Sequence, residues 1–319
     1  MNGGRIINLI LLIIGIGILI FFLSTVDLIS VKEGIETAGP NILFVLIVLL
    51  LINISIKAYR WIILVRKTTN TSIRFGFSFL SIFAGVSSGS LLPGRNEATK
   101  PLLLKYHYKL PFSKTMPTAF MEKAFDFIAL IVLFLIALAY IPGKSTLSVY
   151  FLPVIIVGIL LVLGFLIFPK HLSKIGILII DKLPLPRKHK KILTSFSKIF
   201  FATFDILKGR SAITLFVLSF ISMLSEALRI FYLFLAFGMA VSFTTASVAF
   251  TGSLIAGILT LIPGGIGVTE TSASLLLASL TSYEISSITP LVLIDRVIVY
   301  YLVVAVGSLV AIFHKRLLR

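Results

Sequence analysis

The sequence predicts an all-α polytopic membrane protein with about six full spans, two re-entrant hairpins and an inverted-topology repeat. Three observations lead to this fold class. Hydrophobic residues make up 58% of the chain and the mean hydropathy is +1.11, far above the balance of a soluble domain. Several uncharged runs reach the roughly 20 residues that a helix needs to cross a bilayer. Two shorter uncharged stretches end in Pro-Gly breaks with similar surroundings.

Six segments are long and apolar enough for full spans, at roughly 6–26, 40–65, 122–142, 147–168, 212–237 and 288–313. The first lacks the small-residue cleavage site of a signal peptide, so we expect it to be retained. The stretches 75–92 and 246–262 are rich in Gly and Ser and stop at Pro93-Gly94 and Pro263-Gly264. Such short apolar helices predict re-entrant hairpins, which membranes tolerate where protein or water surrounds them.

The charge distribution predicts the orientation. The chain has 29 Lys and Arg against 12 Asp and Glu, and the basic residues gather between apolar runs. This is typical of cytoplasmic loops that face lipid, so we expect no nucleic-acid partner. The basic loop 169–211 should lie on anionic lipid headgroups, whereas the acidic loop after the first span should lie outside. The protein should therefore be a multi-pass cell-membrane protein with both termini cytoplasmic.

The two halves of the chain resemble each other around their Pro-Gly breaks. LLPGRNEATKPLLL at 91–104 is similar to LIPGGIGVTETSASLLL at 261–277. Arg60 and Arg229 precede these breaks at almost equal distances. We therefore expect one integral membrane domain, 1–319, with a first repeat at 1–142 and a second, inverted repeat at 143–319. Transporters built this way bind substrate where broken helices meet near the midplane. The alternative is an old duplication that serves packing alone.

Little in the sequence predicts catalysis. There is no cysteine, the four histidines are scattered, and no nucleotide-binding P-loop motif is present. We expect no metal, no cofactor and no catalytic residues, and so no enzyme. Carboxylates alone remain for acid–base chemistry.

Charged residues inside the apolar segments are the candidate site residues, because each is costly in hydrocarbon. Glu97 and Glu270 follow the Pro-Gly breaks, where a carboxylate caps a new helix or, alternatively, pairs with Arg95 or takes up a proton. Each of these two residues is followed 25 positions later by a pair of adjacent charged residues. Glu97 precedes Glu122-Lys123, and Glu270 precedes Asp295-Arg296.

The positions of these second pairs differ in depth. Glu122 and Asp126 share one face of the third span near its cytoplasmic start, where Lys123 is able to snorkel to the interface. Asp295 and Arg296 lie deep in the last span, which favours a functional or pairing role. Glu226 and Arg229 can pair with each other within one helix. The glycines at 264, 265 and 267 allow a tight turn and leave backbone N–H groups for an anion.

At these motifs the chain resembles the transmembrane, flippase-like region of lysylphosphatidylglycerol synthases and its stand-alone relatives. The resemblance rests on Pro93-Gly94-Arg95 with Glu97 and Lys100-Pro101, on Glu122-Lys123 with Asp126, on Pro263-Gly264-Gly265-Ile266-Gly267-Val268 with Glu270, and on Arg296. It implies movement of a lipid with a polar or anionic headgroup between leaflets. The expected substrate-binding residues are Arg95, Glu97, Lys100, Glu122, Asp126, Gly264, Gly265, Gly267, Glu270, Asp295 and Arg296.

Three functions remain open from the sequence. A carrier would hold the headgroup phosphate at Arg95 and Lys100 from the cytoplasmic side, and would use Glu97, Glu270 or Asp295 for ion coupling. A non-catalytic membrane subunit would support a partner enzyme that transfers aminoacyl or glycosyl groups to lipid. An intramembrane enzyme acting on lipid is the third. The carrier is favoured because the repeat and the family resemblance both indicate transport.

Overall fold

The structure is a computed structural model that describes residues 28–91, 95–141, 210–260 and 262–317, with isolated positions between 174 and 209. Within 28–40, 89–97 and 311–319 it describes no side chains, and the same holds for residue 263. The predicted spans 6–26 and 147–168, the break at Pro93-Gly94 and most of the loop 169–211 lie outside the described residues.

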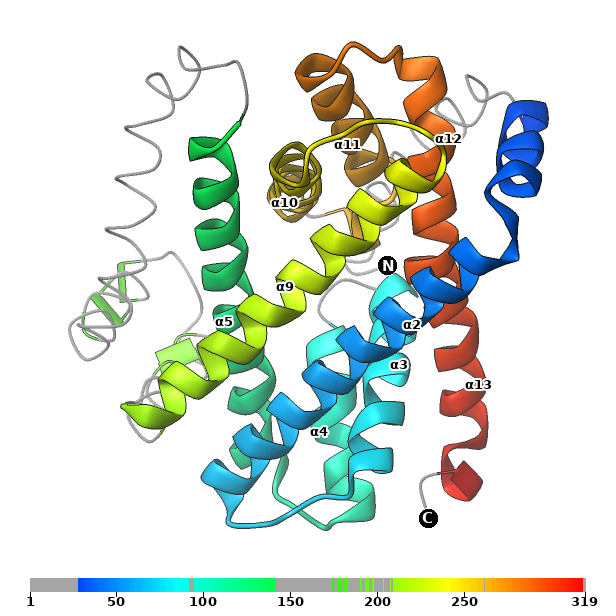
Figure 1. The fold of residues 1–319 in the computed structure, drawn as a ribbon. Coiled ribbons are helices and arrows are strands. Elements are labelled where there is room, and N and C mark those ends of the chain that lie inside the picture. Colours follow the sequence, from blue (N-terminus) through cyan, green and yellow to red (C-terminus); the bar gives the residue numbers. More distant parts are fainter. Residues whose placement is uncertain are drawn as a thin grey trace.

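The described chain consists of helices joined by short turns, and the ranges given above contain no strand. The elements are α2 (Leu28–Thr69), α3 (Phe75–Leu91), α4 (Arg95–His107), α5 (Phe112–Ala139), α9 (Arg210–Ala236), α10 (Phe243–Thr260), the short 3-10 turn η1 (Pro263–Gly265), α11 (Val268–Leu280), α12 (Ile285–Arg296), the π-helical η2 (Val297–Tyr301) and α13 (Leu302–Leu317). Figure 1 shows their arrangement.

Four helical segments in the described ranges are long and apolar enough to cross a membrane: Asn41–Thr69, Arg210–Ala236, Phe243–Thr260 and Ile285–Val310. The chain is therefore an all-α, multi-pass membrane protein. Most of the segment 122–142, predicted as a third span, lies in α5. The segment 246–262, predicted as half of a hairpin, lies mostly in α10, which at 18 residues meets the length of a span. The structure thus confirms the helical membrane class without confirming the number of spans or the hairpins.

Helix ends follow from local chemistry. Arg66 and Lys67 occupy the last turn of α2, where cations complement the helix dipole. Pro111 precedes α5 in an extended conformation, and Pro117 lies inside α5, where it lacks the N–H group for one hydrogen bond of the helix. Between α10 and α11, Gly264, Gly265 and Gly267 all have positive φ angles. Glycine is the residue that adopts this conformation without steric cost, so the motif forms a sharp turn.

Helices α2 and α9 cross the centre of the molecule side by side (Figure 1), and α3, α5, α10 and α12 pack directly against this pair. Helix α10 appears almost end-on in the same view, so it runs across the direction of α5 and of the continuous α12–η2–α13 segment. The main hydrophobic core joins Leu50 and Ile54 of α2 to Leu233 of α9 and Phe250 of α10. A second cluster surrounds the fully buried Trp61.

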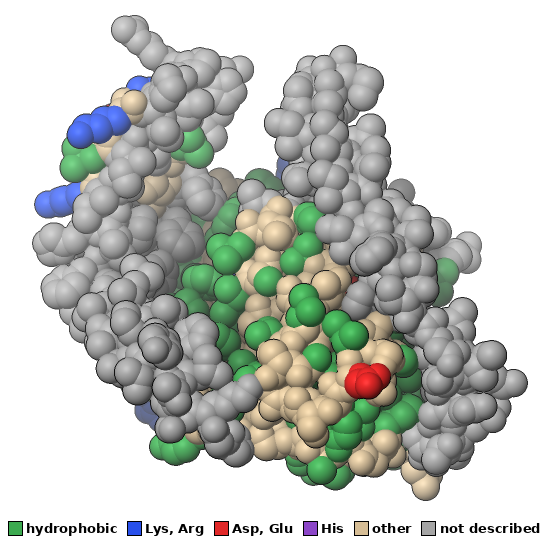
Figure 2. Space-filling view, turned by 90° about the horizontal axis from the view of Figure 1, so that it is seen from above, with side chains coloured by type: hydrophobic (Ala, Val, Ile, Leu, Met, Phe, Trp, Pro, Cys, Tyr) green, Lys and Arg blue, Asp and Glu red, His purple; other side chains and the backbone are tan. Residues whose placement is uncertain are grey.

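The neighbours of α2 and α9 follow one pattern. Helix α2 packs on α3, α3 on α4 and α4 on α5, and in the same way α9 packs on α10, α10 on α11 and α11 on α12. The described surface seen from above is mostly hydrophobic or uncharged, with few charged side chains (Figure 2). Several charged side chains of these helices are instead buried, among them Arg60 of α2, Glu226 and Arg229 of α9, and Asp295 of α12.

Candidate functional site

The first buried charge cluster is centred on Arg60 of α2, whose side chain is fully buried. Its Nη2 atom lies 2.9 Å from Oε1 of Glu122 and 3.0 Å from Oδ2 of Asp126. Lys100 of α4 pairs with the second oxygen of Glu122, and its ammonium group lies 5.0 Å from the centre of the Trp61 ring. Glu122 and Asp126 thus share one face of α5, and three helices meet at one arginine.

The second cluster is centred on Arg229 of α9, which is also almost completely buried. Its Nε and Nη2 atoms lie 2.7 and 3.3 Å from the two carboxylate oxygens of Asp295 in α12. Its Nη1 atom lies 2.5 Å from Oε2 of Glu226, one turn earlier on α9. A two-pronged contact of this kind fixes the guanidinium plane as well as neutralising its charge.

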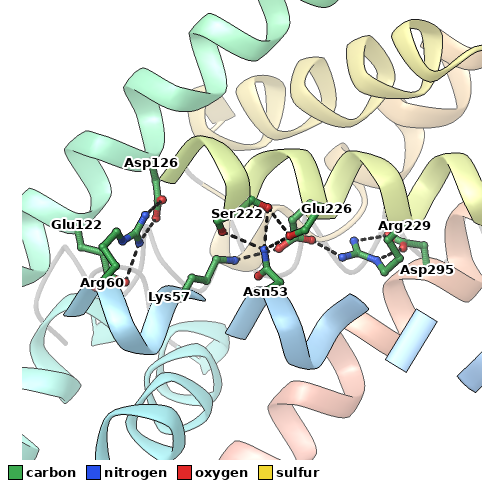
Figure 3. Close-up of polar contacts among 10 residues, drawn as sticks. Asn53, Lys57, Arg60, Glu122, Asp126, Ser222, Glu226, Arg229 and Asp295 are labelled. Atoms are coloured by element: carbon green, nitrogen blue, oxygen red, sulfur yellow. Dashed lines mark hydrogen bonds and ion pairs between the residues drawn. The ribbon is translucent and has the colours of Figure 1, made fainter. Parts of the chain in front are cut away.

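A polar seam between α2 and α9 joins the two clusters (Figure 3). Lys57 Nζ lies 3.0 Å from Oε1 of Glu226, so that Glu226 binds Lys57 and Arg229 together. One turn earlier, Asn53 Nδ2 donates to the backbone oxygen of Ser222 at 2.8 Å and to Oγ of Ser225 at 2.9 Å. The seam therefore runs from Asn53 to Arg60 on α2 and from Ser222 to Arg229 on α9.

The third group joins α11 to α12. Arg296 Nε lies 3.1 Å from Oε1 of the buried Glu270, and Thr269 Oγ1 donates to the other oxygen of this carboxylate at 2.8 Å. The Arg296 guanidinium also lies 5.5 Å from the centre of the Tyr300 ring. A Cβ atom added at Gly264 would be 2.0 Å from the Tyr300 hydroxyl oxygen, so the glycine turn packs directly on η2. Short π-helical segments such as η2 are frequent at functional sites.

These groups border a cavity of about 710 Å³ between α5, α9, α10, α11 and α12. Its walls are apolar and include Phe127, Leu130, Phe250, Leu254 and Ile258. Its charged lining consists of Lys57, Lys123, Asp126, Glu226, Arg229, Asp295 and Arg296. Mostly apolar walls with a few convergent polar groups are typical of ligand sites, and this combination suits an amphiphilic molecule.

The structure places the predicted site residues in three groups. Asp126, Asp295 and Arg296 line the cavity, whereas Lys100 and Glu122 lie behind Asp126 in the Arg60 cluster. Glu270 lies in α11 against Arg296, and the glycines at 264, 265 and 267 form the turn before α11, with Gly264 against Tyr300 and Gly265 beside Thr269. Arg95 and Glu97 are in the first turn of α4, and their side chains fall outside the described residues.

The predicted site omitted several side chains that line this cavity. Lys57, Lys123, Glu226 and Arg229 all do so. The sequence did indicate these residues, because each is a charged side chain within or beside an apolar segment. A charge in hydrocarbon is costly unless it is paired or has a function. Lys57 in particular lies inside the predicted span 40–65.

Comparison with known proteins places the chain in a family. The model of the lysylphosphatidylglycerol synthase TM region matches residues 8–307. A UPF0104 membrane protein of Pyrococcus horikoshii is 24% identical over 97% of both chains. One of Methanothermobacter thermautotrophicus is 24% identical over 80% of this chain and 78% of its own length, and one of Methanocaldococcus jannaschii is 23% identical over 90% and 88%. No solved structure matches. The family predicted from the motifs is thus confirmed: the chain belongs to the lysylphosphatidylglycerol synthase TM region family.

Proposed function

We propose that the protein moves a lipid with a polar or anionic headgroup from one membrane leaflet to the other. The observation that carries this proposal is the cavity. Its lining combines several charged side chains with apolar walls, inside a bundle of membrane helices. A headgroup taken into hydrocarbon alone would lose its hydration, and a charged cavity replaces part of it. The acyl chains would remain against Phe127 and Ile258, which line the cavity and are 44% and 49% exposed.

The inverted repeat is part of the proposal, and the ion pairs support it. Arg60 lies 66 residues before Asp126, and Arg229 lies 66 residues before Asp295. Both arginines hold these acids by more than one hydrogen bond. Two matching buried clusters, one in each half, are what an inverted repeat would produce, and many transporters are built from such repeats. We propose that both termini are cytoplasmic. We also propose that, because the repeats are inverted, the two clusters lie in opposite halves of the membrane.

A role in transport, not chemistry, fits the state of the carboxylates. Asp126, Glu226 and Asp295 line the cavity, and each forms an ion pair with a buried arginine. The oxygens of these carboxylates are occupied by guanidinium donors, which leaves them poorly placed to accept a proton from a substrate. We therefore propose that the protein is not an enzyme, and that these acids hold the cationic groups of the cavity in place.

The proposal is tested by blocking the cavity. Ala124 lines it from α5, and Ile136 lies on the same helix but faces away from the protein and is 46% exposed. Purified protein is reconstituted into liposomes with a fluorescent phospholipid, and external dithionite reports how fast the lipid reaches the outer leaflet. We expect Ala124→Trp to stop movement and Ile136→Trp to leave the rate unchanged.

Two results would contradict the proposal. Equal rates for Ala124→Trp and the wild-type protein would show that lipid does not pass through this cavity. A folded wild-type protein that moves no lipid alone, but that restores activity to a separate lipid-modifying enzyme, would indicate the subunit role instead.

A further inference from the structure

The cavity is shared unevenly between the two halves of the chain. Under the repeat proposed above, α9, α10 and α11 are equivalent to α2, α3 and α4, because a shift of 169 residues relates Lys57 to Glu226 and Arg60 to Arg229. Helices α9, α10 and α11 all contribute side chains to the cavity lining. Of the described side chains of α2, α3 and α4, that of Lys57 alone does so. An exact repeat would place a matching space in the first half, between α12, α2, α3, α4 and α5.

Trp61 of α2 fills the position of that matching space. The same shift makes Trp61 equivalent to Ile230 of α9, which lines the cavity. Trp61 is fully buried in the second hydrophobic cluster, where its ring stacks on Phe77 with 6.4 Å between the ring centres. Tryptophan is the larger side chain, so the first half is filled at a position that borders open space in the second half.

Lys100 and Leu104 of α4 complete this filling. When the two Pro-Gly motifs are aligned at their last leucines, Leu104 is equivalent to Leu277 and Lys100 to Ala273. Both of these α11 residues line the cavity. Their α4 equivalents are buried, Leu104 in the second hydrophobic cluster and Lys100 with its ammonium group over the Trp61 ring. The two halves therefore pack differently at the same place.

The packing of the first half leaves two buried donors unsatisfied. Among the described residues, Nε1 of Trp61 and Nε of Arg60 have no hydrogen-bond partner. A buried tryptophan N–H group usually finds an acceptor, and a buried donor without one is costly. Both donors belong to residues whose equivalents, Ile230 and Arg229, line the cavity. Entry of water into the first half would give each donor an acceptor.

The third helices of the two halves differ in backbone conformation as well. The segment η2 is π-helical over Val297–Tyr301, whereas the equivalent residues 128–132 belong to the regular α-helix α5. Val299 of η2 lines the cavity. Single π-helical turns inside α-helices are frequent at functional sites. The unequal halves thus extend to the helix that borders the open space.

From these differences we infer that the protein has a second conformation, in which the cavity extends into the first half and Trp61 acts as the gate. The centre of the cavity is common to both conformations, since both members of the equivalent pairs Asp126–Asp295 and Leu130–Val299 line it already. In the second conformation the Trp61 ring leaves its place, and α10 and α11 close on α5. The inference rests on the proposed function, because it names the change that would expose the central charges to the other face of the membrane.

Thiol labelling tests whether the first half opens, because the chain has no cysteine of its own. Leu277→Cys reports on the open half and Leu104→Cys on the closed half. Leu46→Cys is the control, at a fully buried position of the main core that does not line the cavity. Each variant, in lipid nanodiscs, is reacted with a small water-soluble maleimide. A minor conformation is commonly populated at about 0.1–10%, so Leu104→Cys should react at roughly that fraction of the Leu277→Cys rate, and Leu46→Cys more slowly still.

A tryptophan placed in the open half distinguishes a moving gate from a fixed filling. Ile230→Trp occupies the cavity of the second half and leaves Trp61 unchanged. It should lower the Leu277→Cys rate and raise the Leu104→Cys rate by about tenfold or more, because it disfavours the conformation described above. Leu254→Trp fills the same half from α10 and should act alike. The control is Ile221→Trp, at an exposed position of α9 outside the cavity lining, which should change neither rate.

Melting temperatures show which of these variants are folded, and two results would overturn the inference. One is a Leu104→Cys rate no higher than that of Leu46→Cys, which Ile230→Trp and Leu254→Trp also fail to raise. The first half would then be filled permanently. The other is a Leu104→Cys rate equal to that of Leu277→Cys in the otherwise unchanged chain, since Trp61 would then gate nothing. Lipid movement in liposomes alongside either result would leave the proposed function standing. The expected labelling in a protein that moves no lipid would contradict the proposed function alone.

Discussion

Lys57 and Glu226 form an ion pair of 3.0 Å across the crossing of α2 and α9, and 169 residues separate them. The same separation joins Asn53 to Ser222, one turn away on both helices. Two residues that occupy equivalent positions in two repeats touch each other only on the axis that relates the repeats. If a shift of 169 residues relates the two halves, that axis passes through this seam. The same shift makes Asp295 equivalent to Asp126, whereas the sequence motifs made Asp295 equivalent to Glu122.

The Arg60 cluster should be essential for stability. Arg60→Ala removes the ion pair that Arg60 forms with Asp126 and leaves Glu122 with Lys100, and removal of one partner from a buried charge group typically costs about 3–5 kcal/mol. We expect a large fall in the melting temperature in detergent. Arg66→Ala is the control, because Arg66 is an exposed residue at the end of the same helix and should cost less than about 1 kcal/mol. Equal melting of the two variants would show that the Arg60 contacts contribute no net stability.

Arg229 should not tolerate replacement by lysine. Lysine keeps the charge but cannot reach both oxygens of Asp295 and the carboxylate of Glu226 in a planar fork. We expect Arg229→Lys to unfold at a clearly lower temperature than wild type. Lys57→Met should have a smaller effect, because Lys57 makes one ion pair and is 24% exposed. A reversed order of these two variants in thermal melting would contradict the central position of Arg229.

The glycine turn should be sensitive at Gly264 through its contact with Tyr300. Gly264→Ala adds a Cβ atom 2.0 Å from the Tyr300 hydroxyl oxygen, at a residue with a φ angle of 67°. The left-handed conformation alone costs roughly 1–2 kcal/mol for a residue other than glycine. We expect a lower melting temperature, which Tyr300→Ala in the same chain should partly restore.

The matched control for this turn is Gly76→Ala. Gly76 lies in the first turns of α3, and a Cβ atom there meets nothing within 4 Å. It should therefore be neutral or slightly stabilising, since alanine is the better helix former. A Gly264→Ala protein as stable as the Gly76→Ala protein would rule out a close contact between the turn and η2.

The proposed orientation is tested by thiol labelling, which the absence of cysteine from the chain makes simple. Ala240→Cys, in the exposed turn between α9 and α10, should react with a membrane-impermeant maleimide in intact cells. Lys114→Cys, in the first turn of α5, should react only after permeabilisation. Both positions are exposed, so access to the thiol does not depend on local unfolding. Labelling of Lys114→Cys from outside would reverse the orientation.

The helical membrane class and the family were determined by the sequence. Long uncharged runs are specific to membrane helices, because hydrocarbon offers no partner for exposed backbone groups. The sharp turn at Gly264, Gly265 and Gly267 also followed from local chemistry, since three closely spaced glycines after Pro263 permit positive φ angles. The shared face of Glu122 and Asp126 followed from helical periodicity, and both acids bind Arg60. Each of these features depends on neighbours in the chain.

The partners of the buried charges were decided by tertiary structure alone. Lys100 is a plausible headgroup cation in the sequence, yet in the fold it is buried between Glu122 and the Trp61 ring, away from the cavity. Lys123 follows Glu122 directly and lines the cavity instead. A membrane helix is apolar on every side, so its sequence does not reveal which face meets which helix. Pairs such as Arg229 and Asp295, 66 residues apart, form only when α9 and α12 pack together.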